Sequence, residues 1–218
     1  YHHWLIEQGF EPENGSFFTR SEAARLPEAF GKPAYLAHEA SRFMREHCAE
    51  PFALFVNLLE PHMPFFGPRD DQYNLSQVTL PSNYDALPAD DQPLKARLFQ
   101  HAYAQRGHSG LPLRDEQDWR RMIAHYWGLC SLVDTHVGTI LTTLYECELD
   151  EHTIVVYTSD HGDMMGSHQL LAKCVAFEEA IRVPMMIRVP GQRHQVCIPG
   201  PVSQIDLVPT LLDLLGIE

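Results

Sequence analysis

The sequence predicts an α/β fold in which a mostly parallel sheet is sandwiched by helices. Three apolar segments, 52–59, 153–158 and 182–189, have the composition of strands. The first two carry no charge, which is typical of strands buried on both faces of a parallel sheet. Helical periodicity fills much of the chain between them, and strands that alternate with amphipathic helices are typical of this fold class.

The length and charge of the chain indicate a single domain and exclude some classes of binding partner. A chain of 218 residues, 44% hydrophobic and 21% charged, is predicted to form one domain with a sizeable core. Its net charge of −13 argues against nucleic acid and anionic membranes as partners, since both are polyanions. No apolar run reaches the roughly 18 residues that span a bilayer. An anionic substrate would need positive charge concentrated at one place.

The first part of the chain predicts one short helix, one longer helix and one strand. Residues 1–30 show no sustained period and are expected to form a loop with one short helix. His2 and His3 receive no role, because terminal histidines beside an aromatic residue are ordinarily surface or packing residues. Apolar residues at three- and four-residue steps predict a helix over 34–47, and the strand at 52–59 follows it.

A histidine between two prolines follows this strand. The segment reads Glu60-Pro61-His62-Met63-Pro64-Phe65. The prolines restrict the backbone on both sides, so the imidazole is presented from a stiff loop. Ligands of α/β sheets bind beyond the carboxyl ends of strands, which favours a role in a site. The alternative is a histidine merely packed between prolines.

The middle of the chain is predicted to be a loop-rich excursion followed by a long helix. Prolines and scattered polar residues mark 66–115 as a surface excursion. Asp115 is a plausible N-cap for a helix that reaches about residue 149. His125 and His136 lie on this helix about 16 Å apart, too far to share a metal, and are interpreted as ordinary surface or boundary residues.

The strand at 153–158 ends in Ser159-Asp160-His161-Gly162. Asp160 offers a hard oxygen ligand and His161 an imidazole nitrogen, and Gly162 would let the backbone turn so that both converge on one ion. The alternative is an N-capping Asp followed by a solvated His. Beyond the strand at 182–189, a closing helix is predicted over 205–215, with its leucines packed in the core.

These motifs together resemble the sulfatases of the alkaline phosphatase superfamily. The second metal-binding block of that family is similar to Ser159-Asp160-His161-Gly162-Asp163, Gly166, His168, Lys173, Phe177-Glu178-Glu179 and Arg182-Val183-Pro184. The family's Pro-His-x-Pro-(Phe or Tyr) segment is similar to residues 61–65, and its Asp-Leu-Val-Pro-Thr-Leu-Leu helix to residues 206–212. The resemblance therefore covers most of the chain.

The resemblance implies roles for four residues. Asp160 and His161 would bind a divalent metal, with calcium first and magnesium or manganese as alternatives because a nitrogen ligand stands where many sulfatases have Asn. Lys173 would neutralise charge on the sulfate oxygens, and His62 would bind the ester near its leaving oxygen. Glu178, Glu179 and Arg182 are interpreted as structural residues that satisfy one another.

The resemblance also implies an incomplete catalytic domain. The sulfatase nucleophile is a formylglycine made in a Cys/Ser-x-Pro-x-Arg motif, and none of the five cysteines stands in that context. We expect residues 1–218 to form a single partial domain, the later part of a sulfatase catalytic domain, with formylglycine upstream and no turnover of its own. Family resemblance implies a periplasmic, secreted or lysosome-like compartment, with the cytoplasm as an alternative.

Three functions follow as hypotheses. The first is a sulfuric ester hydrolase that acts on a sulfate ester of a sugar or of an aryl or alkyl compound. The second is a phosphoester or phosphonate monoester hydrolase or phosphotransferase of the same superfamily, since a metal, a lysine and a histidine treat phosphate oxygens similarly. The third is a non-catalytic remnant that binds an anionic glycan.

Overall fold

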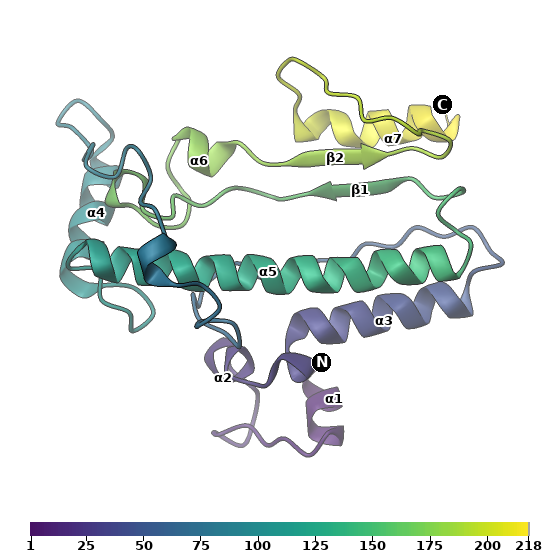
Figure 1. Cartoon of the computed structure of the whole chain (residues 1–218), viewed down its shortest axis with the longest axis horizontal. Helices are drawn as coiled ribbons and strands as arrows, with labels where there is room; N and C mark the ends of the chain where they lie inside the picture. The colour runs from purple at the N-terminus through teal and green to yellow at the C-terminus, as the bar shows by residue number, and fades with distance from the viewer. Residues whose placement is uncertain (218) are drawn as a thin grey trace.

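The computed structural model describes residues 1–217 and shows a helix-rich structure built along one long helix (Figure 1). Helix α5 crosses the molecule, with α3 along one side and the pair β1–β2 along the other. The α-helices are α1 (His2–Glu7), α2 (Arg20–Ala24), α3 (Lys32–Glu46), α4 (Leu94–Arg106), α5 (Glu116–Glu146), α6 (Glu178–Ile181) and α7 (Leu207–Leu215), and the strands are β1 (Val155–Thr158) and β2 (Met185–Arg188).

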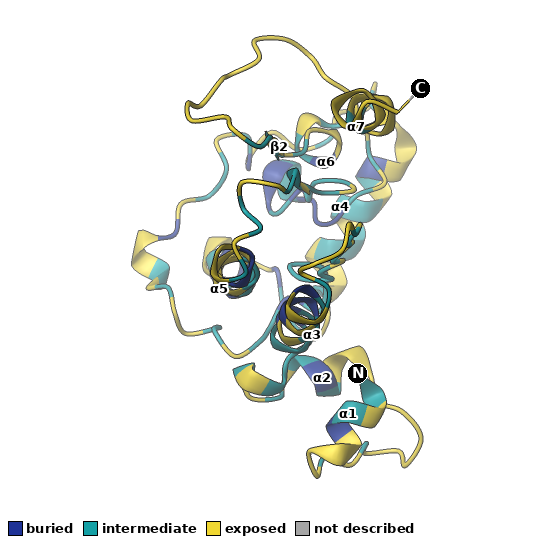
Figure 2. Ribbon diagram, turned by 90° about the vertical axis from the view of Figure 1, so that its right-hand side faces the viewer, coloured by how far each residue is buried: buried dark blue, intermediate teal, exposed yellow. Residues whose placement is uncertain are grey.

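The two helices predicted from periodicity, α3 and α5, are confirmed. Asp115 caps α5 as expected, since its carboxylate accepts a hydrogen bond of 2.9 Å from the Asp118 backbone N–H. The buried faces of α3 and α5 are turned toward each other (Figure 2). Between them the Thr143 hydroxyl donates to the Ser41 hydroxyl over 2.9 Å, so the buried polar pair is satisfied.

The predicted parallel sheet is not present within residues 1–217. Strands β1 and β2 pair antiparallel, with Val155 opposite Arg188 and Thr158 opposite Met185. Residues 52–59 run extended but form no strand, and the Phe55 side chain is 84% exposed. An apolar run can indicate that a segment is suited to burial, but a strand forms only where a second backbone accepts and donates its hydrogen bonds.

Three further expectations are corrected by the structure. Residues 1–30 hold two short α-helices, α1 and α2, instead of one. The excursion at 66–115 contains α4 and contributes buried side chains to the core, among them Val78, Tyr84 and Leu113. Helix α7 forms as predicted and ends at the left-handed Gly216, but most of its apolar residues are exposed and none is buried in a core.

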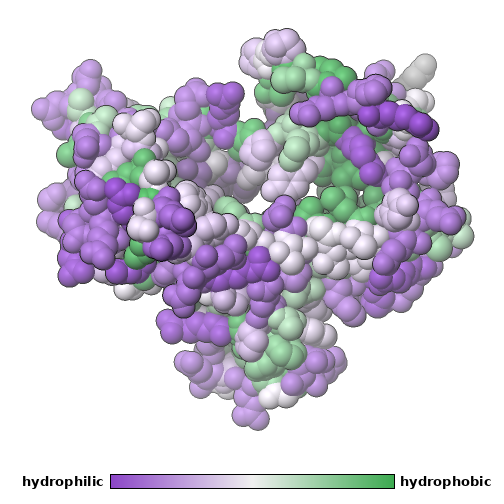
Figure 3. All heavy atoms as spheres, in the orientation of Figure 1, coloured by the Kyte–Doolittle hydropathy of each residue, from purple (hydrophilic) through white to green (hydrophobic). Residues whose placement is uncertain are grey.

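Apolar surface remains open on one part of the molecule. Apolar residues, green in Figure 3, gather over α7 and around an opening between the β1–β2 pair and α5. Exposed apolar residues of these elements include Met186 on β2 and Val208 on α7. Within the described residues, no helix is both long and apolar enough to cross a membrane.

The main core joins the two loops that carry the predicted catalytic residues. Phe65, three residues after His62, and Leu171, two residues before Lys173, are both fully buried in it. Trp119 and Met122 from the first turns of α5 pack in the same cluster. Since interiors are close-packed, this core fixes both loops relative to α5.

Two glycines of α5 test how closely the excursion packs on this helix. A Cβ at Gly128 would overlap the backbone carbonyl of Arg69, whereas a Cβ at Gly138 would meet nothing within 4 Å. Gly128→Ala is expected to lower the free energy of unfolding by about 1–3 kcal/mol through overpacking. Gly138→Ala should raise it by about 0.5–1 kcal/mol through helix propensity alone.

The measurement is urea unfolding of both variants, followed by circular dichroism. Both substitutions add the same methyl group to the same helix, so propensity cancels in their difference. Equal stabilisation by the two alanines would contradict the close contact between Gly128 and Arg69.

Candidate active site

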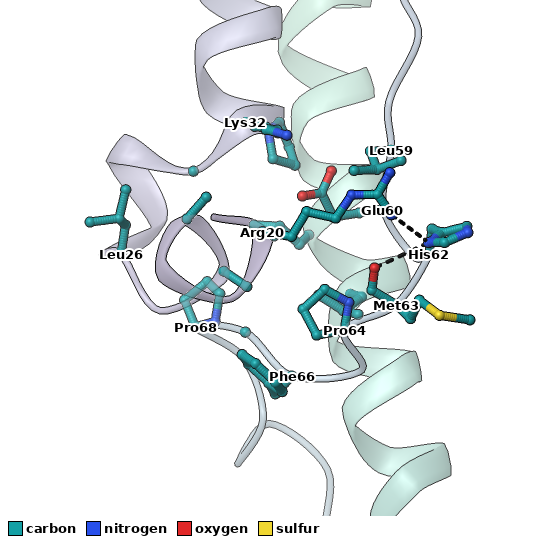
Figure 4. A pocket seen from close by; sticks show the side chains of 17 residues that line it. Arg20, Leu26, Lys32, Leu59, Glu60, His62, Met63, Pro64, Phe66 and Pro68 are labelled. Atoms are coloured by element: carbon teal, nitrogen blue, oxygen red, sulfur yellow. Dashed lines mark hydrogen bonds between the residues drawn. The ribbon is translucent and has the colours of Figure 1, made fainter. Parts of the chain in front are cut away.

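His62 sits on a loop that the core holds in place. The next buried residue, Phe65, accepts a hydrogen bond of 3.0 Å at its carbonyl from His125 Nδ1 on α5. His125, which was predicted to be an ordinary surface or boundary residue, therefore holds this loop against α5. His62 Nδ1 lies 3.1 Å from the Met63 carbonyl oxygen (Figure 4).

Lys173 and His62 meet although 111 residues separate them. Lys173 Nζ lies 2.6 Å from His62 Nε2. An ammonium group only donates, so Nε2 accepts this hydrogen bond. The ring proton then resides on Nδ1 and is donated to the Met63 carbonyl, which accounts for both contacts with a neutral imidazole.

The loop that carries Lys173 has a strained backbone. Ala172 and Cys174, on either side of the lysine, have φ values of 59° and 76°, and three further non-glycine residues of this loop also have positive φ. These three are Met165, His168 and Gln169. Each such residue costs about 1–2 kcal/mol in the left-handed region, and strain of this kind persists only where neighbours over-determine it.

Contacts of Asp163 and His168 hold the backbone of this loop in its strained conformation. Asp163 Oδ1 accepts backbone hydrogen bonds from Met165 (3.0 Å) and Ala172 (2.9 Å), which closes the loop at its base. The His168 ring stacks on Phe177 at 4.4 Å between centroids and contacts Asn83 at 3.3 Å. The excursion at 66–115 thus contacts the loop that carries Lys173 through Asn83 and restricts its conformation.

Asp160 and His161 also form a pair. Asp160 Oδ2 lies 3.4 Å from His161 Nε2, and the Asp160 side chain is 84% exposed. His161 Nδ1 lies 2.7 Å from the Gly162 carbonyl and donates its proton there, so the lone pair of Nε2 is free on the side of Asp160. Both expected ligand atoms are therefore available at one place.

The donor set fits a divalent cation in part. Two ligand atoms 3.4 Å apart match adjacent positions around an ion with bonds of about 2.1–2.5 Å. Within residues 1–217 no group of three or more His, Cys, Asp or Glu side chains is arranged to hold a metal. Asp160 and His161 would thus form part of a ligand set and not a complete one.

Asp163 is linked to both pairs, because it follows His161 by two residues and accepts a hydrogen bond from Ala172, which precedes Lys173. Burial raises the pKa of the Asp163 carboxyl, while the charges of His161 and Lys173 act in the opposite direction. The structure forms two contacting pairs from the four predicted residues, Asp160–His161 and His62–Lys173, and the roles of these residues stay predictions.

Gly162 is needed for a reason other than the one expected. It is not in the left-handed region, so a sharp turn is not what requires glycine here. Its N–H donates to the Ala180 carbonyl over 2.9 Å, and a Cβ would overlap the carbonyl oxygen of Glu179. The close approach of two backbones excludes a side chain, and it fixes Asp160 and His161 against α6.

Neither of the acidic residues expected to pair with Arg182, Glu178 and Glu179, does so. Glu179 accepts a hydrogen bond of 2.7 Å from the Asn83 side chain, which lies in the excursion. Its role is structural, as predicted, but its partner is not Arg182. Within the described residues, no carboxylate lies within salt-bridge distance of Arg182, and no cationic side chain lies within that distance of Glu178.

Two residues of this region were missed by sequence reasoning. Arg20 Nη1 lies 3.5 Å from His62 Nδ1 (Figure 4), although residues 1–30 show no pattern that indicates a site. Asp163 stands inside the matched motif, but nothing in the sequence shows that its carboxylate closes the lysine loop. In the sequence, only the position of Asp163 close to the proposed metal ligands indicated a place in the site.

The fold and these motifs place the chain in the alkaline phosphatase superfamily. Within it, the chain belongs to the sulfatase family, since the family model described as Sulfatase matches residues 7–217. The superfamily resemblance seen in the motifs is thereby confirmed.

Relatives agree with this assignment. The chain is 31% identical to the multifunctional alkaline phosphatase superfamily protein PehA of Trinickia caryophylli, over all of this chain and 47% of PehA. It is 33% identical to the uncharacterized sulfatase YidJ of Escherichia coli (strain K12), over 90% of this chain and 38% of YidJ. The chain thus spans less than half the length of these relatives.

A solved structure shares the fold. The phosphonate monoester hydrolase of Agrobacterium radiobacter is 25% identical and superposes with a TM-score of 0.75, over 99% of this chain and 47% of that protein. The sulfatase-like fold is therefore present in the part of the domain that the chain represents.

Asp163 offers a test of the loop that presents Lys173. Asp163→Ala removes the acceptor of two backbone N–H groups, and the free energy of unfolding is expected to fall by about 2–4 kcal/mol. Asp163→Asn keeps an Oδ1 acceptor without the buried charge, so it should cost less than half as much. Chemical denaturation of both variants measures the difference. Equal losses would show that charge, and not the two hydrogen bonds, closes this loop.

Proposed function

We propose that this chain forms part of the active site of a metal-dependent sulfuric ester hydrolase. The substrate would be a sulfate ester of a sugar or of an aryl or alkyl alcohol. The observation that carries the proposal is the contact of Lys173 with His62, together with the contact of Asp160 with His161. Membership of the sulfatase family supports it, since hydrolysis of sulfuric esters is the activity of that family.

The residues of this chain would bind and orient the ester. A divalent cation held by Asp160 and His161, calcium first with magnesium or manganese as alternatives, would supply positive charge to the sulfate oxygens. Lys173 would exchange its bond to His62 for a sulfate oxygen and stabilise the charge that grows there. Once Lys173 leaves, His62 would take up a proton from solvent at Nε2 while Nδ1–H stays on the Met63 carbonyl, and the imidazolium would give that Nε2 proton to the leaving alcohol oxygen.

The nucleophile would come from outside residues 1–218. None of the five cysteines stands in a Cys-x-Pro-x-Arg context, so we propose that a formylglycine is contributed from elsewhere and that these residues alone have no turnover. The extended segment 52–59, with Phe55 exposed, fits a strand that joins a larger and mostly parallel sheet in the complete protein. The greater length of the relatives supports this proposal.

A second candidate is a phosphonate monoester or phosphoester hydrolase. The similarity to the phosphonate monoester hydrolase of Agrobacterium radiobacter and to PehA, which is named as multifunctional, favours it. A lysine, a histidine and a cation would stabilise phosphoryl oxygens as they do sulfuryl oxygens. The relative rates on the two esters therefore decide between the candidates.

The test uses the full-length protein with 4-nitrophenyl sulfate and 4-nitrophenyl phenylphosphonate. Lys173→Met is expected to lower kcat/KM by about 100- to 1,000-fold, because one preorganised charge at the oxyanion is lost. Lys95→Met on α4 is the matched control, since Lys95 lies over the Phe99 ring at 5.5 Å and away from His62. Chelation should abolish activity, and calcium or manganese should restore it.

The outcomes separate the hypotheses. Faster turnover of the sulfate supports the sulfatase, and faster turnover of the phosphonate supports the second candidate. Wild-type activity in Lys173→Met, or full activity after chelation, contradicts the proposed site. Anion binding without turnover of either ester would leave the non-catalytic glycan-binding remnant as the explanation.

A further inference from the structure

Arg20 is a second cation beside His62. It is the first residue of α2, and its guanidinium lies next to the imidazole at the edge of a pocket (Figure 4). Nη1 of Arg20 is 3.5 Å from His62 Nδ1, whereas Lys173 Nζ is 2.6 Å from Nε2. Two cations therefore flank one imidazole, each at a different ring nitrogen.

Arg20 is exposed, and its guanidinium has no carboxylate partner in the described part of the chain. The proton on His62 Nδ1 is donated to the Met63 carbonyl, so this nitrogen offers Arg20 no lone pair. Within residues 1–217, no carboxylate oxygen lies within 4 Å of Arg20, although the chain holds 29 acidic residues. Many other arginines have a carboxylate partner, namely Arg42, Arg45, Arg69, Arg97, Arg114, Arg120 and Arg121.

The charges that line the pocket do not cancel this cation. Lys32 and Glu60 line the same pocket, on the other side of Arg20 from His62 (Figure 4). Burial raises the pKa of the Glu60 carboxyl, and one of its oxygens is buried without a partner. The pocket therefore carries an excess of positive charge in a chain whose net charge is −13.

The backbone of Arg20 is held firmly against the loop of His62. The preceding residue, Thr19, accepts a hydrogen bond of 3.2 Å from the Glu22 N–H and donates its own N–H to the Glu22 carboxylate over 2.6 Å. This reciprocal capping box fixes the start of α2. At the other end, Arg25 lies over the Phe66 ring at 4.9 Å.

We propose that Arg20 is a specificity-determining residue that binds a second anionic group on the alcohol part of the ester. This inference rests on the proposed function. An ester group that faces Lys173 and Asp160 would present its alcohol part toward His62, and a carboxylate or sulfate carried by that part would reach Arg20. A guanidinium binds either group through two parallel hydrogen bonds.

The test measures binding of anions that cannot be hydrolysed, so it does not depend on turnover. Isothermal titration calorimetry with the full-length protein compares benzenesulfonate with 4-carboxybenzenesulfonate and benzene-1,3-disulfonate. Wild type is expected to bind the dianions about 10-fold more tightly than the monoanion, because one additional charge-assisted hydrogen-bonded pair increases the affinity by about this factor. Arg20→Gln should bring this ratio near 1, and Arg20→Lys should retain part of it.

The control is Arg193→Gln, which removes the same charge from an exposed residue outside the lining of this pocket and should keep the wild-type ratio. A preference for only one dianion identifies the second group as carboxylate or as sulfate. An unchanged ratio in Arg20→Gln, or no preference for dianions in wild type, overturns the proposal. Normal dianion preference without hydrolysis of any ester would instead count against the proposed function alone.

Discussion

The contact between the Lys173 ammonium and His62 Nε2 is the interaction on which the rest of the site depends. It joins two loops that lie 111 residues apart in sequence. Each loop is secured by a buried neighbour, Phe65 on one side and Leu171 on the other, and both neighbours pack against the first turns of α5. The long helix is thus the scaffold of the site, although it contributes no predicted catalytic residue.

Charge is distributed unevenly in this acidic chain. With a net charge of −13, the molecule as a whole repels anions, yet Lys173, Arg20 and Lys32 gather around His62 or the pocket beside it. Local fields at short range outweigh distant charges, because salt screens interactions beyond about 8–10 Å. The strained loop around Lys173 fits the same picture, since such strain is typically retained where function requires a fixed geometry.

The sequence predicted what local periodicity and motif spacing determine. Helices α3, α5 and α7 follow from apolar steps and caps. His62, Lys173, Asp160 and His161 were selected by the resemblance to the sulfatases, and the structure shows them as two contacting pairs while their roles stay predictions. It could not predict the direction of strand pairing, the unpaired segment 52–59 or the exposed face of α7, because these depend on which chain lies alongside. Arg20 was missed for a similar reason, since only the folded loop brings it to His62.

The most direct measurement of the central claim is a crystal structure of the full-length protein with calcium and inorganic sulfate. The account expects Asp160 Oδ2 and His161 Nε2 on the cation at about 2.1–2.6 Å. It also expects Lys173 to turn from His62 to an oxygen of the bound anion. A cation held elsewhere, with Asp160 in solvent and Lys173 still on the imidazole, would contradict it.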